Sequence, residues 1–169
     1  MTIIVAPYSR VLSLLISRRP SHVLTLLSPE TEPPACPGIL PERHLKLSFH
    51  DVAMPMEGLV APDRGIIDEI LEFEKSWNAA APILVHCWAG ISRSTAAAFI
   101  LACRRAGPGR EHAIAQSLRN ASPSATPNSL MVRLADEALG RDGAMIAAAT
   151  AIGRGSDALE GVPFEVALT

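Results

Sequence analysis

Residues 82–94 have the sequence PILVHCWAGISRS, and this stretch decides the fold. Its first four residues form a short, largely apolar run bounded by turn-forming residues, as expected for a central strand that is covered on both faces. An Ala-rich segment over 92–105 follows, and Gly107-Pro108 ends it, which predicts a helix. A strand, a tight loop of small residues and a helix are therefore predicted in immediate succession.

The segments on both sides of this stretch alternate between strand-like and helical patterns. Short runs rich in Val, Ile, Leu and Phe predict further strands at 3–5, 22–27 and 44–49. Apolar residues at helical spacing predict helices at 9–18, 62–77, 110–120 and 127–139. This alternation predicts an α/β fold, in which a small, mostly parallel sheet is flanked by helices.

Two regions depart from this alternation. Residues 28–41 contain five prolines and a glycine, which excludes regular structure and predicts a loop. Near the end of the sequence, 144–151 is expected to extend the helical layer. Residues 153–169 are weakly patterned, and we expect them to form a C-terminal tail of the same domain as residues 1–152.

The composition favours a single globular domain without a general affinity for polyanions. The 169 residues are 49% hydrophobic, and the net charge of −2 gives no electrostatic reason to bind nucleic acid or an anionic membrane surface. No signal sequence or membrane span is evident. The sequence has three cysteines, Cys36, Cys87 and Cys103. Because they are few and odd in number, we expect no disulfide framework, and we expect a cytoplasmic location. The oligomeric state is left open.

The loop after the predicted strand carries a chemical pattern. His86-Cys87 is followed by five residues and then by Arg93-Ser94. Between a strand end and a helix start, small residues let backbone N–H groups point inward at the positive end of the helix dipole, where they bind a tetrahedral dianion. Arg93 adds a planar fork that holds two oxygens at once. The same positive field favours the thiolate of Cys87, the form that acts as a nucleophile.

This pattern resembles the signature of the cysteine-dependent protein tyrosine phosphatase superfamily, in its compact dual-specificity-like branch. Asp51 on an upstream loop and Pro127-Asn128 at the start of a late helix are similar to the family's pattern as well. The resemblance implies a phosphatase-like catalytic domain over 1–152 and a phosphomonoester hydrolase that acts through a phosphocysteine intermediate. Its expected substrate is a phosphorylated protein or a small phosphomonoester.

The resemblance also implies individual roles. Cys87 attacks phosphorus, Arg93 holds the phosphoryl group through the transition state, and Ser94 assists departure of the thiolate. His86 organises the loop and is not expected to act as a base. Backbone donors for the phosphate are expected from Trp88, Ala89, Gly90, Ile91 and Ser92. No cofactor is implied, and the histidines and cysteines show no metal-ligand spacing.

The general acid is expected to be Asp51, with Asp63 as the rival. Asp51 ends a predicted strand and is followed by Pro55, as on the acid-bearing loops of similar phosphatases. Asp63 follows Pro62 at a predicted helix start, where an acidic side chain complements the helix dipole and so has a structural explanation.

Several alternatives stay open at this level. A phosphate-binding module that recognises a phosphorylated partner without turnover would keep the same loop, whereas sulfurtransferases of the rhodanese type usually have a loop one residue shorter. Phosphotyrosine in a protein is the leading substrate, and phosphoserine, phosphothreonine or a small phosphorylated metabolite is the alternative, because no phosphotyrosine-capping loop is identifiable. Inositol lipids are disfavoured because Trp88, Ala89 and Ile91 carry no charge. Cys103 is expected to lie in the core, and a reversible disulfide with Cys87 is the alternative.

Overall fold

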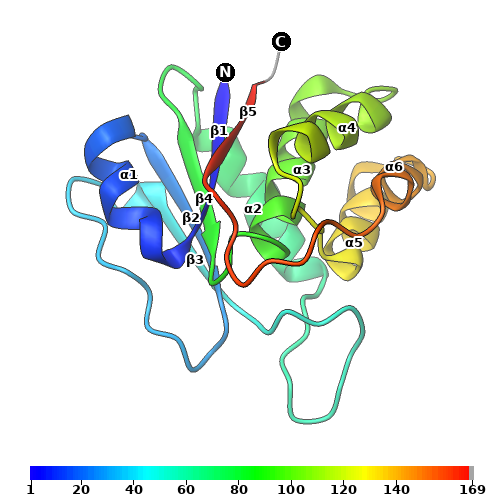
Figure 1. Ribbon diagram of the computed structural model, residues 1–169, viewed down its shortest axis with the longest axis horizontal. Helices are drawn as coiled ribbons and strands as arrows, with labels where there is room; N and C mark the ends of the chain where they lie inside the picture. Colours follow the sequence, from blue (N-terminus) through cyan, green and yellow to red (C-terminus); the bar gives the residue numbers. More distant parts are fainter. Residues whose placement is uncertain (168–169) are drawn as a thin grey trace.

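The computed structural model describes residues 1–167 and contains one five-stranded sheet (Figure 1). Its strands lie in the order β3-β2-β4-β1-β5, and the first four are mutually parallel. Their bounds are β1 Thr2–Pro7, β2 His22–Leu27, β3 His44–Ser48, β4 Ile83–Cys87 and β5 Phe164–Ala167. The predicted α/β fold with a mostly parallel sheet is confirmed.

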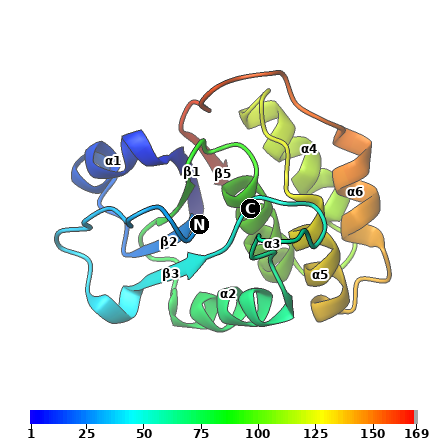
Figure 2. The ribbon, with the colours of Figure 1, turned by 90° about the horizontal axis from the view of Figure 1, so that it is seen from below.

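Helices cover both faces of this sheet. Helix α1 lies on one face, and the other five lie on the opposite face, as the view from below shows (Figure 2). Their bounds are α1 Val11–Arg18, α2 Arg64–Ser76, α3 Arg93–Ala106, α4 Glu111–Ala121, α5 Ser129–Leu139 and α6 Ala144–Ile152. Short 3₁₀ turns precede α1 and β3, at Tyr8–Arg10 and Pro41–Arg43. No helix of residues 1–167 is both long enough and apolar enough to cross a membrane.

Helix α3 lies in the middle of the larger layer. It packs on β1 and β4 and also contacts α2, α4 and α5. Every residue from Arg93 to Cys103 is buried, which requires a helix without a solvent face. The run Ala96-Ala97-Ala98 satisfies this requirement, because small side chains allow close approach of neighbours on several sides. The Ala-rich sequence therefore allows α3, which begins immediately after the segment 88–92, to be buried on all sides.

The prediction of a tail over 153–169 was wrong for 164–167, because these residues form β5. This strand pairs antiparallel with β1, with Phe164 opposite Val5. Phe164 and Val166 are buried while Glu165 is exposed, which is the alternation of an edge strand. A run of four residues is too short for that alternation to stand out from the sequence. Residues 168–169 lie outside the described part.

The carboxyl ends of the four parallel strands meet at one edge of the sheet, at the bottom of Figure 1. The chain leaves β1 at Tyr8, β2 at Ser28, β3 at Phe49 and β4 into the segment 88–92. In open parallel sheets this edge is where ligands bind. The topology therefore brings together residues that are far apart in the sequence.

Candidate active site

The segment 86–93, called the 86–93 loop below, curls around the thiol of Cys87. Cys87 ends β4 and is buried, and its Sγ atom accepts a hydrogen bond from the N–H of Gly90 at 3.2 Å. The hydroxyl oxygen of Ser94, in the first turn of α3, lies 3.2 Å from the same sulfur. An inward N–H, a hydroxyl and a helix start therefore surround the sulfur atom, an arrangement that stabilises negative charge.

Gly90 is required by a close approach of β1. Its backbone has φ of +70°, and a Cβ atom built there would lie 2.6 Å from the backbone nitrogen of Pro7. Just after β1, the N–H of Tyr8 donates to the carbonyl of Trp88 at 3.0 Å. From the other side, the N–H of Gly161 donates to the carbonyl of Ala89 at 2.8 Å. Two distant segments thus hold the outer side of the 86–93 loop.

Arg93 is the first residue of α3, and its side chain is almost fully buried. Its Nη1 donates to the carbonyl of Phe49 at 2.7 Å and to the hydroxyl of Ser28 at 3.2 Å. These contacts come from the ends of β3 and β2 and fix the guanidinium in place. Its Nε is buried without a hydrogen-bond partner among residues 1–167, so this donor is available for an anion in the loop.

Asp51, the acid candidate from the sequence, lies next to the 86–93 loop. One carboxylate oxygen, Oδ1, accepts hydrogen bonds from the Ser92 hydroxyl at 2.7 Å and from the Asn128 amide at 2.8 Å. The other, Oδ2, lies 3.9 Å from Nε of Arg93. Asp63 has a different position, because it caps the start of α2 and accepts the N–H of Ile66 at 3.0 Å. Of the two candidates, Asp51 is thus the one that contacts the 86–93 loop, and Asp63 is a helix cap.

Asn128 joins α5 to the segment that carries Asp51. Its Oδ1 caps α5 by accepting the N–H of Met131 at 3.0 Å, and its Nδ2 donates to Asp51 and to the carbonyl of Val52 at 3.1 Å. The two sets of bonds fix which side of the amide carries the nitrogen. The Pro127-Asn128 pair marked the start of a helix, whereas its contact with Asp51 spans 77 residues and has no local signal in the sequence.

His86 belongs to a buried polar row that sequence reasoning missed. Its Nε2 lies 2.7 Å from the hydroxyl of Thr25, which in turn lies 2.8 Å from Nε2 of His44. Because the hydroxyl has one hydrogen, it donates to one ring and accepts from the other. Burial lowers the pKa of both imidazoles to about 4, so both are neutral at neutral pH. The only sequence signal was a threonine within the otherwise apolar run of β2.

The remaining predicted residues differ in environment. Cys103 is fully buried in α3, and burial raises the pKa of its thiol to about 12 with a further contribution from Glu111, so the thiol is not in its reactive form. Trp88 directly follows Cys87, and its ring is exposed and packs against Tyr8 at a centroid distance of 5.5 Å. Trp88 therefore lies at the rim of the site.

Comparison with known proteins shows which fold this is. No family model and no curated protein matches the sequence. Among solved structures, the human tyrosine phosphatase-like serine/threonine/tyrosine-interacting protein aligns with a TM-score of 0.61 at 23% identity, over 80% of this chain and 89% of that one. DUSP15 aligns with a TM-score of 0.63 at 19% identity over 89% of each chain. Human DUSP28 aligns with a TM-score of 0.61 at 18% identity, over 86% and 92%.

These alignments span most of both chains, so the likeness concerns the whole domain and not the 86–93 loop alone. The chain has the fold of the compact dual-specificity phosphatases. The fold that the resemblance implied is thereby confirmed.

Proposed function

We propose that this chain is a cysteine-dependent phosphomonoester hydrolase whose substrates are phosphorylated proteins, with phosphotyrosine as the leading target. The observation that carries the proposal is the position of the Cys87 sulfur, 3.2 Å from both the Gly90 nitrogen and the Ser94 hydroxyl, beside the start of α3. A buried thiol in ordinary packing needs no such donors. Arg93, held by two other strand ends, adds a fixed positive charge at the same place.

In the first step the Cys87 thiolate attacks phosphorus, the S–P bond forms, and the bond from phosphorus to the leaving oxygen breaks. The inward N–H groups of the loop and Nε of Arg93 stabilise the charge on the equatorial oxygens. Asp51 gives its proton to the leaving oxygen, which then departs as an alcohol or phenol. Since both hydrogen bonds fall on Oδ1, the proton is assigned to Oδ2.

In the second step a water molecule attacks the phosphocysteine. Asp51, now a carboxylate, accepts the proton of that water, the new P–O bond forms and the S–P bond breaks. The electron pair of the broken bond returns to sulfur, where the Ser94 hydroxyl stabilises the thiolate by a hydrogen bond. Inorganic phosphate is released and the starting state of the site is restored.

A second candidate is a phospho-recognition module that binds a phosphorylated protein without turnover. The observation that favours it is the double hydrogen bond on Asp51, which ties the proposed acid to Ser92 and Asn128. One structural neighbour also bears the name of a phosphatase-like interacting protein. The presence of Cys87, Arg93 and Ser94 together favours the enzyme.

Hydrolysis of an aryl phosphate between pH 5 and 8 separates the two functions. We expect the wild type to turn over, Cys87→Ser to be inactive, and Asp51→Asn to lose about 10²- to 10⁴-fold in kcat together with the limb of the pH profile that reports the acid. Asp63→Asn is the matched control and keeps wild-type kcat. An inert wild type that still binds vanadate would establish the recognition module instead.

A further inference from the structure

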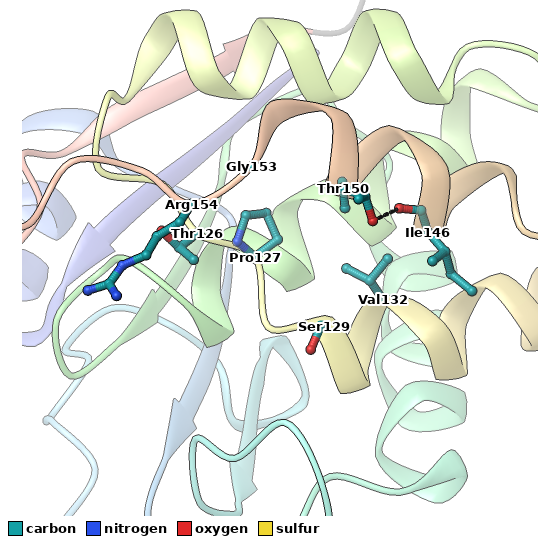
Figure 3. Close-up of a pocket in the computed structure, with 9 residues that line it drawn as sticks. Thr126, Pro127, Ser129, Val132, Ile146, Thr150, Gly153 and Arg154 are labelled. Carbon is teal, nitrogen blue, oxygen red and sulfur yellow. Dashed lines mark hydrogen bonds between the residues drawn. The ribbon is translucent and has the colours of Figure 1, made fainter.

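A second cavity lies beside the proposed active site, between α5 and α6 (Figure 3). Its volume is about 310 Å³, and apolar side chains from both helices and from the start of α5 form most of its wall: Pro127, Val132, Ile146 and Ala149. Val132 is buried, whereas Ile146 is 39% exposed and borders the cavity from α6. The mechanism proposed above makes no use of this cavity.

The cavity is continuous with the site through a shared wall. Thr126, Pro127 and Ser129 line both it and a neighbouring cavity of about 320 Å³ that contains Asp51 and Ser92. The shared wall is also bonded to the 86–93 loop, because the N–H of Thr126 donates to the carbonyl of Ile91 at 2.9 Å. The wall of the cavity therefore adjoins the 86–93 loop at Ile91 and Ser92.

The chemistry of the wall selects an apolar group. Arg154 is the one charged residue on it, and Figure 3 shows its guanidinium directed away from Val132 and Ile146. That guanidinium is largely exposed and paired with Asp157 at 2.6 Å. A volume near 310 Å³ is at the small end of ligand pockets, which span about 300 to 1,000 Å³. It is large enough for one bulky apolar side chain.

We propose that the cavity between α5 and α6 binds an apolar side chain of the phosphorylated protein substrate, close in sequence to the phosphorylated residue. The proposal rests on the proposed function and adds a sequence preference to it. The contacts of the shared wall with Ser92 and Ile91 of the 86–93 loop favour the substrate as occupant over a second copy of this chain, because a substrate bound in that loop is within reach of the wall.

Phosphotyrosine peptides built from Gly and Ser, with a single Leu moved through every position around the phosphotyrosine, test this proposal. We expect one position at which Leu raises kcat/KM about tenfold over Gly, since filling such a pocket gives discrimination of that order. Ala149→Leu, which fills the cavity, abolishes this preference. Ile146→Ser, at an exposed position, weakens it and guards against a folding defect of the first variant.

Ala147→Leu is the matched control, because Ala147 is exposed on the same helix and does not line the cavity. It should keep the preference. The proposal is overturned if no Leu position is preferred, if Ala147→Leu acts like Ala149→Leu, or if light scattering shows that Ala149→Leu breaks up a dimer, which would make a second copy the occupant.

A failure of the proposed function can be distinguished from a failure of the cavity proposal. If the wild type hydrolyses neither an aryl phosphate nor any peptide, the same peptides are measured for binding by fluorescence anisotropy. A Leu-dependent affinity that Ala149→Leu abolishes then supports the cavity proposal without turnover, and affinities that ignore the Leu position overturn it.

Discussion

At position 90 the backbone conformation and the neighbouring strand allow only glycine. Its positive φ and the backbone of β1 that lies against it leave no space for a Cβ atom. We expect Gly90→Ala to destabilise the protein by about 1–3 kcal/mol and to abolish aryl phosphate hydrolysis, because the 86–93 loop must move away from Pro7. Urea unfolding and kcat on the same samples measure both effects.

Gly107→Ala is the control for backbone strain alone. Gly107 has φ of +79°, but nothing lies within 4 Å of the position where its Cβ would be. It should lose about 1–2 kcal/mol and keep its activity. If Gly90→Ala hydrolyses the substrate as the wild type does, the contact between the loop and β1 is not needed for the site.

Thr25 is expected to act as a positioning residue through His86. Thr25→Val keeps the shape but removes the hydroxyl between the buried imidazole of His86 and the half-buried one of His44, and each then loses a hydrogen-bond partner. We expect kcat to fall several-fold while KM changes little. Thr25→Ser restores the hydroxyl and should restore kcat, an outcome that a role in packing alone does not predict.

At the scale of elements, Asn128 allows the cap of α5 to be separated from the support of Asp51. Asn128→Asp keeps a good helix cap but replaces the amide donor next to Asp51 by a second carboxylate, whereas Asn128→Ala removes cap and donor together. Both variants should lose kcat, and only Asn128→Ala should also lose the about 1 kcal/mol that a cap contributes. Equal kcat in Asn128→Asp and wild type would contradict the coupling.

The elements themselves were largely predictable, because their signals are local. The apolar run before His86, the Ala-rich helix after it and the prolines of 28–41 each act within a few residues, and the predicted segments match the observed ones to within about two residues. β5 was missed because its four residues become a strand only through pairing with β1. Local periodicity contains no information about such a partner.

The site was predictable only where its signals are local in the sequence. The spacing of Cys87 and Arg93 is contained in one loop, so the sequence indicates both. The contact of Thr25 with His86 and that of Asn128 with Asp51 join residues 61 and 77 positions apart. They depend on which strands are neighbours, and that order is a property of the folded sheet.

For the whole molecule, two histidines that are partly or fully buried predict a stability that depends on pH. Burial lowers the pKa of His44 and His86 to about 4, from about 6.5 in the unfolded chain. Between these values the unfolded chain binds more protons than the folded one, so the free energy of unfolding falls as the pH is lowered from 6.5 to 4. Urea midpoints across this range measure the fall, and His44→Gln should make it shallower. A pH-independent midpoint would contradict the burial of neutral imidazoles.

The support that Gly161 gives to Ala89 has a consequence for synthesis of the protein. Of the five strands of this sheet β1 is made before the others, yet one of its neighbours is β5, which is made after the other four. Cys87 emerges about seventy residues before Gly161, the outer support of its loop. Ribosome-bound chains stalled before Gly161 are therefore expected to be inactive toward an aryl phosphate. Chains extended past Ala167 should gain activity, and the length at which they do so measures when the nascent protein becomes active.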